Sequence, residues 1–443
     1  MSNVRFIFTG SDNKVGIKEQ NKRYRRGENI MAVFHAFRAL RPTPEKAADV
    51  AALPYDVVNR EEAKSIGDEN PLSFLHIDRP EMDLEPETDL YDERVYEKAK
   101  ENLDNMEEKG ILVQDQKACY YIYELVRKGK TQTGIVGCSS IDDYMNGVVK
   151  KHELTREDKE QDRIHHVDSC NANTGPIFLA CRYSDSLLTL MNNWKDHHEA
   201  AYDFTEEDQI THRVWVIDED EIISEINKEF AGIDSLYIAD GHHRAASAVK
   251  VGLKRREQNP GYTGEEEFNY FLSVVFPYDQ LCILPYNRIV KDLNGLTVKA
   301  FLGALKFNFE LMLMPGFPCK PVEKHCMGMY VDGQWYHLKA WPDVYEKKDV
   351  VGQLDVSILQ EKVLRPVLGI EDPRTDQRIS FVGGSHKAAE LAEIADRTGG
   401  VAFVMYPTSM EDLMKIADEN KLMHPKSTWF EPKLRSGLFI HKL

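Results

Sequence analysis

Five consecutive residues, 240–244, combine a carboxylate, a glycine, two imidazoles and a guanidinium in the order Asp-Gly-His-His-Arg. The apolar residues 236–239 before them predict a buried strand, and the helix formers at 245–250 predict a helix after them. The stretch is therefore a strand-to-helix turn. The first free N–H groups of a helix and the positive end of its dipole point into such a turn, which favours a bound anion. The guanidinium adds a bidentate donor for phosphate or carboxylate.

A second group of candidate residues lies before and within a helix predicted over 156–166. His152 and Glu153 precede this helix, which is polar on nearly every face and carries Arg163. A helix of this kind faces either solvent or a polar cavity. In the second case, Glu153 is placed to act as a general base and Arg163 as a phosphate clamp. The zinc-protease pattern is excluded, because Arg156 stands where that pattern requires a second histidine.

Both groups have an ordinary structural alternative. The turn at 240–244 also fits a capped helix start with two surface histidines, and the polar helix also fits a solvent-exposed one. Adjacent residues on a helix diverge, so the histidine pair does not by itself indicate a metal site. Spacing alone does not decide between these interpretations.

The strand followed by Asp-Gly-His-His-Arg resembles the signature turn of the ParB/sulfiredoxin-like superfamily, in which this turn binds nucleotide phosphates. The chain as a whole resembles a prokaryotic family catalogued as domain of unknown function family 1015. The matching segments are 53–58, 70–75, 152–155, 172–177, 240–244, 284–288 and 426–433. They extend from about residue 32 to the C-terminus, so the resemblance covers nearly the whole chain.

The resemblance implies a function and a set of site residues. The function is that of a nucleotide-dependent small-molecule kinase, which transfers a phosphoryl group from ATP or ADP, with Mg²⁺, to a free hydroxyl amino acid such as L-serine. The catalytic candidates are Glu153, His242 and His243; the nucleotide- or phosphate-binding candidates are Asp240, Gly241, Arg244 and Arg163; the substrate-binding candidates are Asp56 and Asn173. No residue is assigned as a metal ligand.

Other interpretations of the same residues stay open. Asp56 and Asn173 also fit ordinary turn positions. The chain also fits a nucleotide-binding regulatory module without turnover, which needs no general base at Glu153. A metal-dependent hydrolase is the third alternative, and it predicts tight binding of zinc or manganese.

Composition restricts the partners and the compartment. The formal net charge of -17 argues against a nucleic-acid-binding surface, because duplex binding relies on Lys and Arg. No apolar run approaches the roughly 20 residues that span a bilayer, so no membrane partner is expected. The seven cysteines contain no Cys-x-x-Cys pair, which favours free thiols and a cytoplasmic location. The remaining partners are a nucleotide and a small-molecule substrate, and no oligomeric state is predicted.

The predicted fold class is α/β (α+β) with mixed sheets. We expect an N-terminal α/β part over 31–139, a ParB/sulfiredoxin-like core over 140–292 and a smaller C-terminal α/β part over 293–443. Residues 1–30 carry seven Lys or Arg against three Asp or Glu and show little periodicity. The codons for residues 26–30 can form a ribosome-binding sequence just before the codon for Met31. We therefore expect residues 1–30 to be a translated leader or a disordered tail.

Local patterns predict individual elements. A helical period with a charged outer face covers 90–109, and two strands around a short polar turn predict a hairpin over 119–138. Asn59 begins a capping-box pattern. Residues 70–77 are expected to form a turn into a buried strand. The extended segment 426–433 is expected to close over the site.

Overall fold

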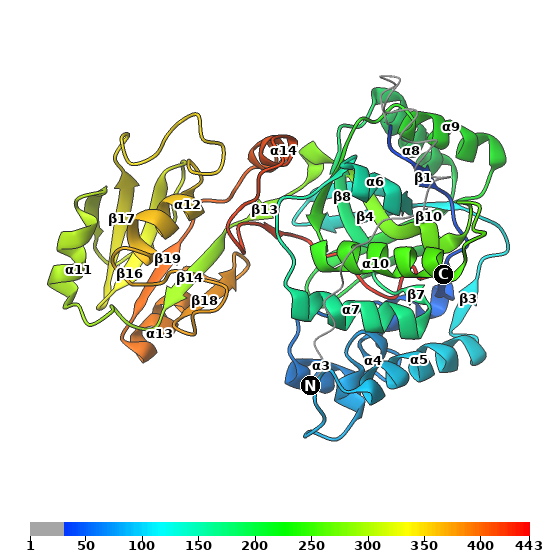
Figure 1. The fold of residues 1–443 in the computed structure, drawn as a ribbon, viewed down its shortest axis with the longest axis horizontal. Coiled ribbons are helices and arrows are strands. Elements are labelled where there is room, and N and C mark those ends of the chain that lie inside the picture. Colours follow the sequence, from blue (N-terminus) through cyan, green and yellow to red (C-terminus); the bar gives the residue numbers. More distant parts are fainter. Residues whose placement is uncertain (1–30) are drawn as a thin grey trace.

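The computed structural model describes residues 31–443, so the predicted leader, residues 1–30, lies outside the described residues. The fold is mixed α/β with several sheets, which confirms the predicted fold class. A larger lobe surrounds a nine-stranded sheet, and a smaller lobe surrounds a six-stranded sheet (Figure 1). The chain enters the smaller lobe once, and its last residues return to the larger lobe, where the C-terminus lies.

The nine-stranded sheet has the order β6-β11-β8-β12-β5-β4-β10-β9, with β1 beside β5. It is mixed, because β11 runs parallel to β6 and antiparallel to β8, whereas β12 runs parallel to β8. Its strands are β1 (Phe34–His35), β4 (Tyr120–Arg127), β5 (Lys130–Ser140), β6 (Val149–Lys150), β8 (Ile177–Cys181), β9 (Tyr202–Thr205), β10 (Ile210–Ile217), β11 (Leu236–Asp240) and β12 (Tyr270–Pro277).

The larger lobe also contains the helices that surround this sheet (Figure 1). They are α2 (Ala47–Val50), α3 (Arg60–Glu69), α4 (Leu75–Asp78), α5 (Glu93–Glu108), α6 (Ile141–Asn146), α7 (Glu157–Cys170), α8 (Asp185–His197), α9 (Asp220–Phe230) and α10 (His242–Gln258). Helix α7 packs between α5 and α10. Short 3₁₀ turns lie at Pro44–Lys46, Pro80–Asp83, Glu267–Asn269 and Tyr278–Gln280.

The six-stranded sheet of the smaller lobe has the order β15-β17-β16-β19-β14-β18. Its strands are β14 (Tyr286–Val290), β15 (Phe309–Met314), β16 (Cys326–Val331), β17 (Gln334–Ala340), β18 (Ile379–Gly383) and β19 (Val401–Val404). Its helices are α11 (Val298–Leu305), α12 (Asp355–Leu359, continued by a π-helical turn at Gln360–Leu364), α13 (Ala388–Thr398) and α14 (Met410–Asp418).

Three two-stranded pairs connect distant parts of the chain. Strand β2 (Leu40–Pro42) pairs with β3 (Leu112–Gln114). Strand β13 (Ile283–Leu284), which leads into the smaller lobe, pairs with β20 (Trp429–Phe430), which returns from it. The last strand, β21 (His441–Lys442), pairs with β7 (Ala172–Asn173). The returning segment is therefore fixed to the larger lobe by backbone hydrogen bonds.

The strands do not follow the predicted segment boundaries. Strand β4 and all but the last residue of β5 precede residue 140, but both strands lie in the same sheet as β8, β11 and β12. Strand β14 precedes residue 293 but belongs to the sheet of the smaller lobe. The division of the chain into domains stays a prediction.

Several local predictions are confirmed. The hairpin is β4 and β5, and the helix expected over 90–109 is α5. Asn59 and Glu62 form the expected capping box at the start of α3. Each of these signals acts within a few residues, so no distant part of the chain has to be known.

The prediction of a buried strand at the end of residues 70–77 is wrong, because these residues lead into helix α4. Asn70 ends α3, and its side chain accepts a hydrogen bond from the Leu72 N–H at 3.0 Å. The Ser73 hydroxyl then accepts one from the Leu75 N–H at 3.3 Å, which starts a helical turn. An apolar run this short has the same appearance in a buried strand and in a buried helical turn.

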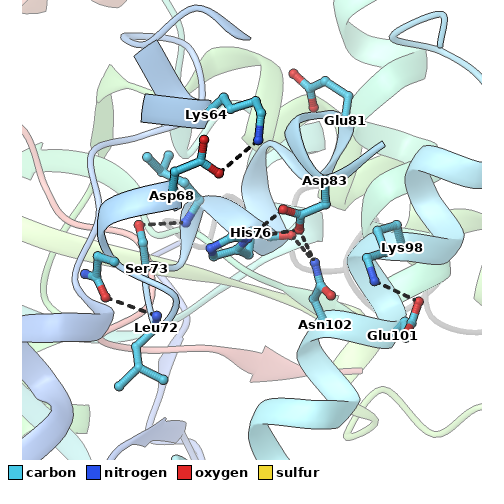
Figure 2. A network of polar contacts seen from close by, with 12 residues as sticks. Lys64, Asp68, Leu72, Ser73, His76, Glu81, Asp83, Lys98, Glu101 and Asn102 are labelled. Atoms are coloured by element: carbon cyan, nitrogen blue, oxygen red, sulfur yellow. Dashed lines mark hydrogen bonds and ion pairs between the residues drawn. The ribbon is translucent and has the colours of Figure 1, made fainter. Parts of the chain in front are cut away.

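A polar network joins α4, α5 and the 3₁₀ turn at Pro80–Asp83 (Figure 2). The Nδ1 atom of His76 lies 2.9 Å from both carboxylate oxygens of Asp83. The side-chain amide of Asn102 donates to Asp83 at 2.9 Å and to the His76 carbonyl at 2.7 Å. This hydrogen bonding raises the pKa of His76, although partial burial opposes the change.

We expect Asp83→Asn to destabilise the protein by about 1 kcal/mol near pH 5.5 and by less near pH 8. The raised pKa of His76 adds stability that is complete below the unfolded-state pKa and is lost as the pH rises through the folded-state pKa. Urea unfolding at the two pH values measures this difference. Glu101→Gln, which removes the nearby ion pair with Lys98, is the control and is expected to give no such dependence. Equal destabilisation by Asp83→Asn at both pH values would contradict the account.

Candidate functional site

The predicted strand-to-helix turn is present between β11 and α10. Strand β11 ends at Asp240, and α10 begins at His242. Gly241 between them is the N-cap residue and has a φ of 93°. This left-handed conformation suits glycine and aims the first N–H groups of the helix into the turn.

Gly241→Ala is expected to destabilise the protein by at least about 1–2 kcal/mol. Besides the strain at positive φ, a Cβ atom there would lie 3.1 Å from Nε of Arg244. The free energy of unfolding in urea measures the loss. Gly110→Ala is the matched control, since Gly110 has a φ of 67° and open space around its Cα. Equal losses in the two variants would mean that the contact with Arg244 adds nothing.

An ion pair holds the carboxylate of Asp240. One oxygen accepts from the Gly241 N–H at 2.8 Å, and the other accepts from Nζ of Lys433 at 2.8 Å. Burial alone would raise the pKa of Asp240, but Lys433 and Arg244 hold this pKa well below its usual value. Lys433 belongs to the segment 426–433, which therefore lies against the turn as predicted.

The two histidines of the turn point in different directions. His242 is buried and meets the ring of His152 edge to face, with 4.4 Å between the ring centroids. His243 lies on the other side, where its Nε2 atom accepts from the Arg156 N–H at 3.0 Å. Burial lowers the pKa of all three histidines, to about 4 for His152. The buried pair is therefore neutral at physiological pH.

A cavity of about 470 Å³ lies beside the turn, which is within the usual size range of ligand sites. Its walls come from the larger lobe, from residues 373–381 of the smaller lobe and from residues 425–426 of the returning segment. Its cationic residues are Arg79, Arg156, Lys159, Arg163, Arg374 and Lys426. Its carboxylates are Asp56, Glu81, Glu153, Asp162 and Asp376. Apolar surface comes from Leu90, Val95, Ile379 and Phe381, among others.

Glu153 lines this cavity from the loop before α7. Burial raises the pKa of its carboxyl, and the nearby carboxylates of Asp240 and Asp56 add to the increase. The positive charge of Lys426 opposes it. A carboxylate with a raised pKa is a better proton acceptor near neutral pH than an exposed one.

Arg163 of α7 is buried against the same cavity. Its guanidinium lies 4.2 Å from the centre of the Tyr55 ring and forms an ion pair with Asp162 at 3.0 Å. The face of α7 that carries Arg163 also carries Glu160, Asp162 and His166, and all four of these polar residues are buried. Of the two interpretations of the polar helix, the structure supports the one in which it borders a polar cavity.

Two predicted residues lie elsewhere. Arg244 donates to the Pro176 carbonyl at 2.6 Å, and its guanidinium borders a separate cavity of about 20 Å³, enough for about one water molecule. Asn173 borders the same small cavity, and its side-chain oxygen accepts from the Leu272 N–H at 3.1 Å. Their predicted contacts with phosphate and substrate stay predictions, whereas Asp56, Glu153, Arg163 and His243 line the larger cavity.

Sequence reasoning missed most of the cations around the larger cavity. Arg156 enters the sequence analysis only as the residue that rules out a zinc motif, and Lys426 only as the first residue of the segment expected to close over the site. Arg374 lies in a loop of the smaller lobe that had no distinguishing pattern. The expected return of the 426–433 segment was the one available signal, because a segment that closes over the site brings its lysines to the cavity.

Comparisons with solved structures give distant likenesses. A free serine kinase in complex with AMP has 13% sequence identity, with 72% of this chain and 92% of that chain covered and a TM-score of 0.34. A conserved hypothetical protein from Pyrococcus furiosus has 15% identity, with 71% and 96% covered and a TM-score of 0.34. A C-terminally truncated SbnI from Staphylococcus aureus has 11% identity, with 69% and 86% covered and a TM-score of 0.36.

No curated protein matched the sequence. Within residues 31–443, no helix has both the length and the apolar character needed to cross a bilayer. A family model matches residues 34–357, which is well over half of the chain. The chain therefore belongs to the family described as "Protein of unknown function (DUF1015)", as its sequence motifs indicated.

Proposed function

We propose that the protein is a phosphotransferase that moves a phosphoryl group from ATP or ADP to the hydroxyl of a small molecule, with a free hydroxyl amino acid such as L-serine as the acceptor class. The observation that carries the proposal is the composition of the larger cavity. It combines a partly buried carboxylate of raised pKa, Glu153, with several cations in a space large enough for a nucleotide.

The cations support the phosphate-binding part of the proposal. Phosphoryl transfer depends mainly on positioning and on neutralising charge, so a phosphate site needs several donors around one space. Arg163 is buried on one wall, Arg156 is the N-cap residue of α7, and Lys426 approaches from the returning segment. The apolar side chains of Ile379 and Phe381 on the facing wall suit a nucleobase.

Glu153 supports the catalytic part. In the proposed reaction, the acceptor oxygen forms a bond to the terminal phosphorus, the bond from that phosphorus to the leaving nucleotide breaks, and the hydroxyl proton passes to Glu153. The neighbouring His243 lines the same cavity and contacts the transferring group in this proposal. The β11–α10 turn positions His243, since α10 begins at His242.

The cavity also fits the Mg²⁺ that such a reaction uses. Asp56 supplies a carboxylate oxygen, and Mg²⁺ in proteins is held by one or two carboxylates together with phosphate oxygens. When bound, the ion would neutralise the charge of the phosphate groups.

The experiment is a transfer assay with ATP, and separately with ADP, in the presence of Mg²⁺ and a panel of free amino acids and small alcohols. A phosphorylated acceptor supports the proposal and identifies the acceptor class. Nucleotide binding without any turnover would instead favour the regulatory module, and release of phosphate without an acceptor would favour a hydrolase.

A further inference from the structure

Three ligand-type side chains converge behind the wall of the larger cavity. His152 and Glu153 come from the loop after β6, and His242 comes from the first position of α10. Each offers one ligand atom, and these atoms all lie within 4.8 Å of one another. Segments far apart in the chain thus bring two imidazoles and one carboxylate together.

The two imidazoles have unused nitrogen atoms. His152 is 1% exposed, and neither of its ring nitrogens makes a hydrogen bond of standard geometry within the described part of the chain, although the Ile238 backbone lies near the ring. His242 is 7% exposed, and its Nε2 atom also lacks a partner there. Buried polar atoms without partners are rare and destabilise a fold. The edge-to-face contact between the rings does not satisfy these nitrogens.

The carboxylate of Asp240, which acts electrostatically on both histidines, does not supply the missing partner. Both oxygens of Asp240 are already engaged, one by the Gly241 N–H and the other by Lys433. The Arg156 N–H is engaged by His243. The nitrogen lone pairs of His152 and His242 are therefore free to coordinate a metal ion.

We propose that His152, Glu153 and His242 bind a divalent transition-metal ion, with Zn²⁺ as the best match. Two histidines and one carboxylate are the protein ligands in one class of catalytic zinc sites, where a fourth position stays open. Imidazole nitrogen suits zinc and its neighbours in the first transition row, whereas Mg²⁺ prefers oxygen ligands. Because Glu153 also lines the larger cavity, the bound ion lies at the wall of that cavity.

The metal site goes beyond the proposed phosphoryl transfer and does not depend on it. Glu153 serves as the general base only while this ion is absent, because a bound cation lowers the pKa of a carboxylate. Metal binding is measured without nucleotide, and phosphoryl transfer is measured with Mg²⁺. Failure of one therefore leaves the other unaffected.

The test is zinc binding by the full-length protein, with any affinity tag removed and bound metals stripped by a chelator. Equilibrium dialysis followed by elemental analysis gives the stoichiometry, and competition with a chromophoric chelator gives the affinity. We expect one Zn²⁺ per chain. His152→Asn and His242→Asn are each expected to weaken binding by more than about 100-fold, because the loss of even an outer-shell partner costs about 10–100-fold.

His243→Asn is the matched control, since it removes an imidazole one residue further along α10 that is not part of the cluster. We expect it to bind zinc like the wild type. If the wild-type protein binds no zinc, the proposal is overturned, and no variant is needed for that conclusion. Undiminished binding by both His152→Asn and His242→Asn would also overturn it, because the ion would then be elsewhere. Urea unfolding of each variant serves as the control that the variant is folded.

Discussion

Glu153→Gln is expected to slow phosphorylation of the acceptor by about 10²–10⁴-fold, the usual contribution of a general base. The amide has nearly the shape of the carboxylate but does not accept a proton at neutral pH. Nucleotide affinity in the presence of Mg²⁺ is expected to stay close to that of the wild type, because Arg163 and Lys426, which are proposed to hold the phosphates, are untouched. The initial rate of acceptor phosphorylation and nucleotide binding by calorimetry measure the two effects separately.

The control for this prediction is Glu157→Gln. Glu157 is an exposed carboxylate in the first turn of α7, close to Glu153 in sequence but not among the residues that line the cavity. This variant is expected to keep the wild-type rate. A Glu153→Gln protein that turned over as fast as the wild type would remove Glu153 from the catalytic role and leave the cavity as a binding site.

Lys433→Met is expected to destabilise the protein by about 3 kcal/mol, because it leaves the carboxylate of Asp240 in a buried position without its counter-charge. The side chains of Lys433 and Asp240 are only 11% and 26% exposed, so water compensates the loss poorly. The free energy of unfolding, measured in urea at neutral pH, gives the cost.

A double variant separates the loss of the ion pair from the loss of packing. Lys433→Met combined with Asp240→Asn removes both charges, and we expect it to recover most of the stability lost by the single variant. Lys64→Met is the control for an exposed pair, since Lys64 and Asp68 are 55% and 64% exposed, and it is expected to cost less than about 1 kcal/mol. A Lys433→Met protein as stable as Lys64→Met would contradict a structural role for the pair.

The strand-to-helix turn was predictable from sequence because its signals are local. Apolar residues, a glycine and helix formers follow one another within residues 236–250, and β11 and α10 have the expected boundary at Gly241. The capping box at Asn59 was predictable for the same reason. The segment 70–77 shows the limit of this reasoning, because its apolar run is too short to distinguish a strand from the helical turn that forms.

The cavity was only partly predictable because distant segments build it. Glu153 and Arg163 were identified as candidates through their residue types and the polarity of the helix. Arg374 and Phe381 reach the cavity only because the smaller lobe faces the larger one, and Lys426 only because the chain returns between them. No periodicity along the sequence encodes these approaches.

The cluster of His152, Glu153 and His242 was also not predictable from the spacing of residues along the chain. His152 and His242 belong to separate groups of candidates in the sequence, because the zinc-protease pattern requires a second histidine four residues after the first. The pairing of β6 with β11 places the two side chains together instead, since β6 leads to His152 and β11 leads to His242. A metal motif that depends on strand pairing is invisible to a rule based on spacing.

The central claim is that the cavity transfers a phosphoryl group to a small hydroxyl rather than to water. Phosphorus NMR of the wild-type protein with ATP or ADP and Mg²⁺, recorded with and without L-serine and then with the other hydroxyl compounds, tests this most directly. The account predicts a phosphomonoester resonance that appears only when nucleotide and acceptor are both present. Free phosphate released at the same rate with and without every acceptor, or no change in the nucleotide, would contradict it.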